Sequence, residues 1–500
     1  MCKLCDEAKP RNHFGSRRNF LKGAVATGAA AAGLNLFAAR PAAADDPPMD
    51  SGRTGRRYII RGGAVMSLDP QIGDFPQADV LVDGKKILAV GPNLQAGGAA
   101  EINASGRIVM PGFIDTHHHQ FETVLRSFLA DGILINDGSG TAAGTITYYE
   151  YILQKFAPVY RPQDVYINEL FGALSQLDDG VTTVHDVSQI HHTPRHSDAA
   201  IQALFDTGRR FAFGYFEGAG SNPQSYAYPQ DAFRIKQQYF SSTDQLATGT
   251  AGSNHDIGLG PDNLFIHMTG MSNFGWQAVQ KAGAQVSIAF PIEMNMRHGM
   301  PPILKLQSLG MEPSLSVDVE CTLTADFFTQ MRSCMNLQRV VLNEMILLQG
   351  SQPDPVDWGL PGEPQGSPSD VPNGNQWPTP PAGTIAPLTT RDVLRFGTMN
   401  GAKALRLDGK TGSLTPGKEA DIIILDATRI NVAPLNQVPG AVVSLMDRTN
   451  VETVIVAGKV RKWKGQLLDV DLPNLRQQLE ASRDYLFSAA NIPQNLFSSQ

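Results

Sequence analysis

An apolar run that ends in three histidines is the feature that most restricts what this chain can fold into. Residues 108–119 read Ile-Val-Met-Pro-Gly-Phe-Ile-Asp-Thr-His-His-His. The apolar, β-branched part is typical of a buried strand. Successive side chains of a strand point to opposite faces, so His117 and His119 share a face and His118 points away. Two imidazoles about 6 to 7 Å apart on one face can bind one divalent cation. The alternative is a polar strand end without a metal, but the spacing Asp-x-His-x-His favours the metal site.

Composition and charge exclude several classes of protein. Five hundred residues, 42% of them hydrophobic, are enough for two or three domains with a large core. The formal net charge is −7, and the first 44 residues are basic, so the remainder is more acidic still. An acidic chain without a basic run is not expected to bind nucleic acid. Cys2 and Cys5 lack the second half of a metal site, and Cys321 and Cys334 are too few for a disulfide scaffold.

The N-terminal segment, residues 1–44, has the pattern of an export signal rather than of a folded element. Arg17 and Arg18 precede Phe-Leu-Lys, an apolar Ala/Gly-rich run covers 23–39, and three alanines stand at 42–44. A membrane anchor is the alternative, but the apolar run is short and only mildly hydrophobic. The pattern resembles a twin-arginine signal. We therefore expect a periplasmic or secreted protein that makes no membrane contact once the signal is removed.

Short strand-like runs separated by turns lie at both ends of the remaining chain. They are found at 58–60, 64–66, 79–82 and 86–90, and again at 420–425 and 451–459. Four strands from one end alone would make a thin sheet, so partners from the other end are expected. The sequence predicts a small β-sandwich built from both termini, residues 57–110 and 407–465, around a central domain.

The central segment, residues 111–406, alternates strands with helices. Strand-like runs at 180–186, 210–215, 263–267, 284–290 and 313–318 follow the histidine strand. This alternation is typical of an α/β protein with a parallel sheet, and here it predicts a (β/α)8-type TIM barrel with polar residues at the strand ends.

Two further segments complete the domain plan. Residues 353–387 are rich in proline and glycine and include Trp358 and Trp377, which suits either a disordered insertion or a lid. The tail, residues 466–500, contains an amphipathic helix over 472–492, which we expect to pack on the sandwich or on a second subunit. The sequence leaves open whether the chain forms a homo-oligomer.

Four motifs between residues 111 and 421 follow one another in the order found in a known protein family. Residues 111–119 resemble the first-strand motif of the amidohydrolase superfamily, in particular its cyclic-deaminase and chlorohydrolase branch. Gly-Val-Thr-Thr-Val at 180–184, followed by Asp186, is similar to the second strand. Asn-Gly-Ala-Lys-Ala-Leu at 400–405 resembles the last barrel helix, and Gly-Ser-Leu-Thr-Pro-Gly-Lys-Glu-Ala-Asp at 412–421 resembles the return into the sandwich. The resemblance spans nearly all of the chain after the signal.

The resemblance implies a set of site residues. His117 and His119 would bind one divalent metal, zinc, with iron and manganese as alternatives. Asp318 would be a third ligand and also the base that takes a proton from water, and His267 matches the sixth-strand histidine that orients the substrate. The chemistry agrees: a divalent metal lowers the pKa of bound water, a carboxylate accepts the proton, and an imidazole polarises the attacked bond.

The chain departs from the family at the fifth strand, which should supply another metal-binding histidine closely followed by a glutamate. Residues 240–263 are too short for a strand, a helix and another strand, so we expect one βα unit to be missing and about seven barrel strands to remain. His255 is the one histidine in this span, either a substitute ligand or a loop residue. Glu293 and Glu320 are further carboxylates that would compensate.

Two functions follow. The first is an exported metal-dependent amidohydrolase that cleaves an amide or cyclic amidine or imine C–N bond of a small molecule. Loss of the fifth-strand glutamate, which protonates a ring nitrogen, disfavours ring deamination. The second is a catalytically degenerate member that binds a small ligand without turnover.

Overall fold

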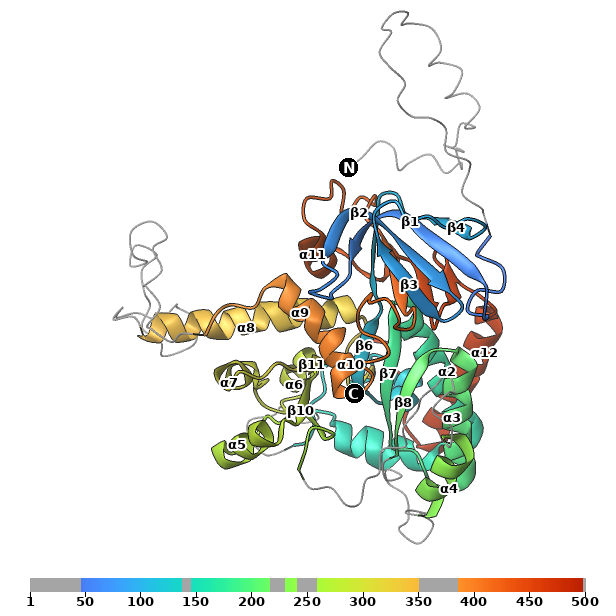
Figure 1. Cartoon of the computed structure of the whole chain (residues 1–500). Helices are drawn as coiled ribbons and strands as arrows, with labels where there is room; N and C mark the ends of the chain where they lie inside the picture. The colour runs from blue at the N-terminus through green and yellow to red at the C-terminus, as the bar shows by residue number, and fades with distance from the viewer. Residues whose placement is uncertain (1–45, 137–144, 216–229, 241–258, 350–384, 498–500) are drawn as a thin grey trace, which may run out of the picture. The chain divides into compact units, whose positions relative to one another are not determined.

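The computed structural model describes residues 46–136, 145–215, 230–240, 259–349 and 385–497 (Figure 1). The predicted export signal, His255 and nearly all of the Pro/Gly-rich insertion lie outside these residues. The predicted domain boundaries at 57–110, 111–406, 407–465 and 466–500 stay predictions. Within the described part of the chain, no helix combines the length and the apolar character that crossing a membrane requires.

Strands from both ends of the chain pair in one nine-stranded sheet, in the order β15-β14-β13-β12-β5-β1-β2-β3, with β4 paired to β1. From the N-terminal side come β1 (Arg57–Met66), β2 (Asp74–Asp83), β3 (Lys86–Gly91), β4 (Ala100–Asn103) and β5 (Arg107–Pro111). From the C-terminal side come β12 (Ile422–Asp426), β13 (Val451–Val456), β14 (Lys459–Trp463) and β15 (Gln466–Leu467). The two sets join where β12 pairs antiparallel with β5. Because all nine strands belong to one hydrogen-bonded sheet, the predicted sandwich of two facing sheets is not confirmed.

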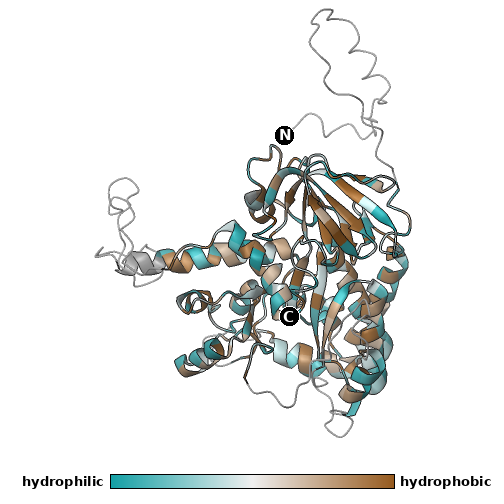
Figure 2. Ribbon diagram, in the orientation of Figure 1, coloured by the Kyte–Doolittle hydropathy of each residue, from teal (hydrophilic) through white to brown (hydrophobic). Residues whose placement is uncertain are grey.

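The two faces of this sheet enter different hydrophobic cores. In β12, Ile422 and Ile424 join a cluster formed by the sheet strands themselves, whereas Ile423 and Leu425 join the cluster that contains Phe113. This is the alternation that a strand buried on both faces requires. Figure 2 shows the strands of the sheet coloured mainly as hydrophobic. One face therefore fastens the sheet to the strand that carries the histidines.

The histidine strand, β6 (Phe113–His118), belongs to a second group of strands. β6 pairs parallel with β7 (Val181–Ser188), which pairs parallel with β8 (Arg210–Tyr215). A separate parallel set contains β9 (Leu264–Ile266), β10 (Gln285–Ile288) and β11 (Ser314–Leu315). The two sets meet at a single parallel bridge between His118 and Asp318. The sequence predicted a (β/α)8-type TIM barrel with one βα unit missing and about seven strands. The described residues form six short strands in two sets of three, and these do not close into a barrel.

Helices follow the strands in the order expected of βα units (Figure 1). They are α2 (Pro162–Asp178), α3 (Pro194–Thr207), α4 (Gln230–Tyr239), α5 (Asn273–Ala282), α6 (Phe290–Asn295), α7 (Ile303–Ser308), α8 (Phe327–Gln349), α9 (Thr390–Phe396), α10 (Met399–Ala404), α11 (Val438–Gly440) and α12 (Leu472–Ala489). Short 3-10 or π helices are η1 (Gln120–Leu125), η2 (Tyr149–Phe156), η3 (Ala157–Val159), η5 (Ala441–Leu445) and η6 (Arg448–Asn450). α3 and α5 both end at a glycine with positive φ, Gly208 at +64° and Gly283 at +69°, which is the usual left-handed end of a helix.

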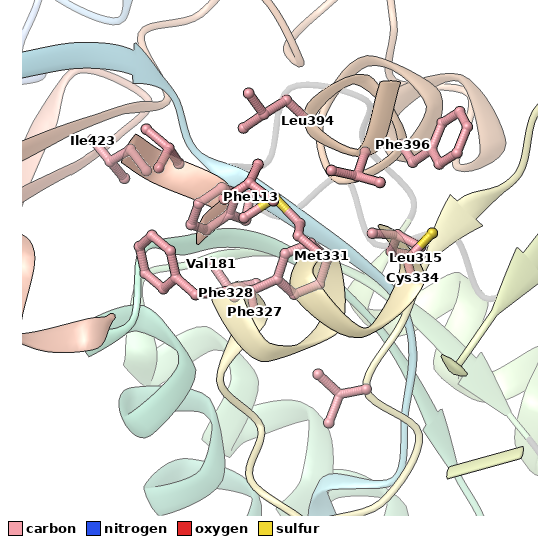
Figure 3. Packing of buried hydrophobic residues seen from close by; sticks show 14 of the residues in the cluster. Phe113, Val181, Leu315, Phe327, Phe328, Met331, Cys334, Leu394, Phe396 and Ile423 are labelled. Carbon is pink, nitrogen blue, oxygen red and sulfur yellow. The ribbon is translucent and has the colours of Figure 1, made fainter. Parts of the chain in front are cut away.

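The start of β6 is held by close packing. The Phe113 ring stacks on Phe327 with 5.4 Å between centroids and meets Phe328 edge-on at 5.2 Å (Figure 3). Gly112 precedes it because a Cβ there would lie 2.2 Å from the side chain of Thr182. Gly401 of α10 likewise lets that helix touch Ile114, where a Cβ would come within 2.8 Å. The Pro-Gly-Phe and Asn-Gly-Ala motifs thus have a packing role: they fix β6 in place.

The C-terminal helix packs on a surface that differs from the prediction. α12 lies against α2 and η1 rather than on the nine-stranded sheet. Leu486 is buried in the cluster that contains Phe156, and Ser482 donates a hydrogen bond to Asp164 of α2 at 2.9 Å. Leu486 of α12 and Val165 of α2 are buried in the same hydrophobic cluster.

A buried ion pair connects β8 to the nine-stranded sheet and leads to a stability prediction. Arg210 is 1% exposed and donates to Asp421 at 2.9 Å and to Glu419 at 2.7 Å. We expect Arg210→Met to lower the free energy of unfolding by about 3 to 5 kcal/mol, because it leaves a buried carboxylate without its cation. Urea unfolding measures this. Arg429→Met, at a half-exposed pair with Asp426, is the control and should cost less than about 1 kcal/mol. Equal losses in the two variants would contradict the prediction.

Candidate metal centre

His117, His119 and Asp318 meet at the end of β6. The Nε2 atom of His117 lies 3.0 Å from Oδ1 of Asp318, and Nε2 of His119 lies 3.5 Å from the same oxygen. All three residues are buried, and their candidate ligand atoms lie within 4.8 Å of one another. His118 takes the other side of the strand, where its Nδ1 lies 3.6 Å from Asp115. The structure thus brings together the three residues expected to hold a metal; their role as ligands stays a prediction.

Backbone contacts hold Asp318 in a conformation that a non-glycine residue rarely adopts. Its φ is +69°. The Asp318 amide donates to the carbonyl of His117 at 2.8 Å, and the His119 amide donates to the carbonyl of Asp318 at 2.8 Å. A left-handed aspartate costs of the order of 1 kcal/mol or more, and such residues cluster at functional sites. The two hydrogen bonds keep the carboxylate in front of the two imidazoles.

His267 faces the other carboxylate oxygen. It follows β9 with a φ of +66°, and its Nε2 lies 3.6 Å from Oδ2 of Asp318. Its Nδ1 lies 3.1 Å from Oε1 of Glu293, a fully buried residue of α6. Burial opposes the charged imidazolium, but Asp318 and Glu293 outweigh it, so the pKa of His267 is raised. Glu293 therefore fixes the orientation of this ring.

Protonation states at the site suit metal binding. Burial lowers the pKa of His117 to about 4 and that of His119 to about 3, which keeps both imidazoles neutral at pH 7. Burial opposes charge on Asp318 as well, but the neighbouring His267, His117 and His119 hold its pKa far below the usual range. Neutral imidazole and ionised carboxylate are the forms that bind metals.

The orientation of the His119 imidazole also fits a metal. Nδ1 of His119 donates to the carbonyl of Val187 at 2.7 Å, which leaves the lone pair on Nε2 facing Asp318. Metal-binding histidines commonly use their second nitrogen in this way. Two imidazole nitrogens and one carboxylate oxygen, with a position left for water, form a workable catalytic zinc set.

The three other residues that the sequence offered as additional or substitute ligands, Glu320, Glu293 and His255, differ in their relation to the site. Glu320 does not face the site, because Arg126 pairs with it at 2.8 Å and Thr123 donates to it. Its expected compensating role is therefore wrong. Glu293 is at the site, but as the partner of His267. His255 lies outside the described residues.

One site residue, His298, escaped the sequence reasoning. It lies in the turn after α6, and a candidate ligand atom of His298 lies within 4.8 Å of those of His267 and Asp318. A histidine directly before Gly299 in a short loop gives no periodic signal. The one sequence signal for a site role of His298 is that it lies five residues after Glu293, close to the end of a strand.

Comparison with known proteins shows what the chain is similar to. The profile of the amidohydrolase family matches residues 385–461. The 5'-deoxyadenosine deaminase of Methanosarcina barkeri is 23% identical over 482 residues, covering 87% of this chain and 99% of the relative. The 5-methylthioadenosine/S-adenosylhomocysteine deaminase of Symbiobacterium thermophilum is 25% identical and covers 81% of this chain and 93% of its own length.

Solved structures show the same fold. An adenosine deaminase from Xanthomonas campestris with bound zinc superposes with a TM-score of 0.66 at 17% identity, over 87% of this chain and 100% of that one. A zinc complex of a variant atrazine chlorohydrolase from Arthrobacter aurescens gives a TM-score of 0.66 at 17% identity, over 85% of this chain and 100% of that one. The chain is thus similar to the amidohydrolase family over residues 385–461, to deaminases over most of its length, and to an adenosine deaminase and a chlorohydrolase in its fold.

Proposed function

We propose that the chain is a metal-dependent hydrolase that cleaves a C–N bond, other than a peptide bond, in a small molecule. The observation that carries this proposal is the buried set of His117, His119 and Asp318, with one carboxylate oxygen 3.0 Å and 3.5 Å from the two imidazoles. Zinc is the metal we propose, since zinc is bound in the similar structures. Iron and manganese are alternatives.

Each residue has a distinct part in the proposed reaction. A divalent metal held by His117, His119 and Asp318 supplies Lewis acidity and lowers the pKa of water. Asp318 would accept the proton of the attacking water, because its carboxylate lies beside the two imidazoles that would hold the metal. His267, kept in orientation by Glu293 at 3.1 Å, donates a hydrogen bond to the attacked group or its leaving nitrogen. Burial of the set excludes bulk water from the carboxylate.

The substrates named for the similar proteins indicate which compounds to test first. Those named above are deaminases of 5'-deoxyadenosine and of methylthioadenosine or S-adenosylhomocysteine. We propose an amino-substituted or amide-containing heterocycle as the substrate class. Among the described residues no glutamate takes the place of the family's fifth-strand glutamate, so hydrolysis of amides and cyclic amidines or imines belongs in the same test.

A screen on the zinc-loaded protein tests the function. The probes are 5'-deoxyadenosine, S-adenosylhomocysteine, a cyclic imide and a simple aromatic amide, with ammonia and product measured by chromatography. His119→Ala is the matched control, because it removes one proposed ligand. Turnover of any probe that His119→Ala abolishes supports the hydrolase. Binding of a probe without turnover in the zinc-loaded protein would instead support the degenerate, ligand-binding alternative.

We also propose export by the twin-arginine route, which rests on Arg17 and Arg18 before the apolar run. Replacing both arginines by lysine should keep the full-length precursor in the cytoplasm of a bacterial host, because this route recognises the arginine pair. Fractionation and immunoblotting of the full chain and of the Arg17→Lys/Arg18→Lys variant measure the effect. Equal amounts in the periplasm would contradict the proposal, and Lys22→Arg serves as the control.

A further inference from the structure

A cavity of about 420 Å³ lies against β14 of the nine-stranded sheet. Three parts of the chain line it: residues 47–53, which precede β1, Lys85 in the turn between β2 and β3, and residues of 457–469 in and around β14. None of the lining residues is a candidate metal ligand around Asp318. The proposed hydrolase reaction therefore makes no use of this cavity.

The walls of the cavity are fastened to the sheet. The hydroxyl of Ser51 accepts the amide of Val460 at 3.1 Å. Gly52 has a φ of +84°, and a Cβ there would lie 2.9 Å from that of Lys459, so the segment before β1 approaches β14 as closely as a backbone can. On the other side, the carbonyl of Lys85 accepts an amide that directly precedes β12, at 2.8 Å. The cavity is therefore a fixed feature of the fold.

Cations outnumber carboxylates in the lining of the cavity. The cations are Arg53, Lys85, Lys459 and Arg461, and the carboxylates are Asp50 and Asp469. Arg53 pairs with Asp50 at 3.2 Å, and Lys459 lies 3.9 Å from Asp469. Within the described part of the chain, neither Lys85 nor Arg461 forms an ion pair with a carboxylate. Two positive charges are thus left without a partner, in a chain whose formal net charge is −7.

Arg461 is the more constrained of these two cations. Its guanidinium lies over Gly208 at the end of α3, where a Cβ would come 2.2 Å from Cζ of Arg461. The negative end of the α3 dipole favours a cation at this place. The Nε atom is nevertheless buried and has no hydrogen-bond partner among the described residues. Burial lowers the pKa of Arg461, and Asp469 offsets this only in part. An anion in the cavity would therefore stabilise this side chain.

The charge and the remaining wall of the cavity indicate the kind of anion. A phosphate monoester carries about −1.5 to −2 at pH 7, which matches two unpaired cations. Guanidinium groups bind phosphate oxygens through paired N–H donors, and lysine adds a point charge. The rest of the wall is apolar and consists of Pro47, Pro48, Met49, Ala457, Val460 and Leu468. Such a wall fits an apolar organic group attached to the phosphate.

We propose that this cavity is a binding site for a small organic phosphate monoester. Arg461 and Lys85 bind the phosphate group, and the apolar wall beside β14 contacts the organic group. The site lies on the nine-stranded sheet, is built from both ends of the chain and does not depend on a metal at His117 and His119.

Isothermal titration calorimetry of the purified protein with phenyl phosphate and with inorganic phosphate tests this proposal. Phenyl phosphate should bind more tightly than inorganic phosphate. Arg461→Gln should weaken the binding of phenyl phosphate by at least about tenfold, because charged hydrogen bonds are lost. Lys85→Gln should weaken it by about threefold, since Lys85 is exposed. Lys86→Gln is the matched control: Lys86 adjoins Lys85 but lies outside the lining and 4.0 Å from Glu419, so the affinity should change by less than about twofold.

Phosphate anions also bind metals, so His119→Ala is titrated in parallel. Binding that His119→Ala retains and Arg461→Gln loses supports the cavity. Binding that His119→Ala loses and Arg461→Gln retains would overturn the proposal and place the anion at the metal set. Equal affinities for the two probes would overturn the organic ligand in favour of inorganic phosphate, and no binding of either probe would overturn the site. The hydrolase proposal stands or falls separately, by turnover. If Arg461→Gln unfolds, Lys85→Glu, which reverses a charge at the exposed rim, gives the same comparison.

Discussion

Replacement of Asp318 by asparagine is expected to lower kcat/KM by about a thousandfold or more, because a positioned base of this kind typically contributes 10²- to 10⁴-fold and this residue is also a proposed ligand. The amide of asparagine has nearly the same shape but accepts no proton. The two backbone hydrogen bonds that hold residue 318 do not involve its side chain, so the local fold should survive. Activity should therefore fall far more than stability.

Steady-state kinetics, metal content and thermal unfolding of Asp318→Asn, His119→Asn and His118→Asn check this expectation. His118 is the matched control, since it neighbours both proposed ligands but points to the opposite side of β6. We expect His118→Asn to retain its metal and most of its activity. Equal loss of metal in His118→Asn and His119→Asn would show that the proposed face of the strand is wrong.

The local part of the site could be predicted from the sequence. His117 and His119 share a face because β6 is a strand, and strand alternation depends only on neighbouring residues. Asp318 and His267 were expected from the family resemblance and not from the local pattern alone. Partner strands from the other end of the chain were also expected, since a sheet with few strands needs them, but their pairing through β12 and β5 was not.

What depended on distant contacts could not be predicted. Glu320 and Glu293 look alike in the sequence, yet Arg126 neutralises the first and His267 engages the second. The position of His298 depends on Thr269 and Gly299, which set the path of a short turn. Likewise, the amphipathic pattern of residues 472–492 predicts that one face of the helix is buried. It does not predict that this face packs against α2.

Arg209 supports the site from behind, and its loss is expected to destabilise the fold strongly. It is 1% exposed, donates to Gln176 at 2.6 Å and also donates to Gln120. Gln176 in turn donates to Asp115, whose other oxygen accepts the amides of His117 and Val317. One guanidinium therefore holds the backbone on both sides of the proposed metal site.

We expect Arg209→Met to lower the free energy of unfolding by about 3 to 5 kcal/mol at pH 8, because the buried carboxyls of Asp115, Asp186 and Glu169 would lose the positive charge beside them. Urea unfolding measures this, with metal affinity as a second readout. Arg209→Lys should recover part of the loss, since it restores the charge but not the fork that reaches two glutamines.

The loss should depend on pH in a definite direction. Burial raises the pKa of Asp115 and of Asp186 to about 7 each, well above the usual aspartate value. Below that pH the folded protein holds these carboxyls protonated, so the missing cation matters less, and above it they are charged and uncompensated. The difference in unfolding free energy between Arg209→Met and the unmodified protein should therefore shrink as the pH falls from about 8 to about 5.5. A difference that stays constant over this range would mean that the arginine acts through its hydrogen bonds to the glutamines and not through its charge.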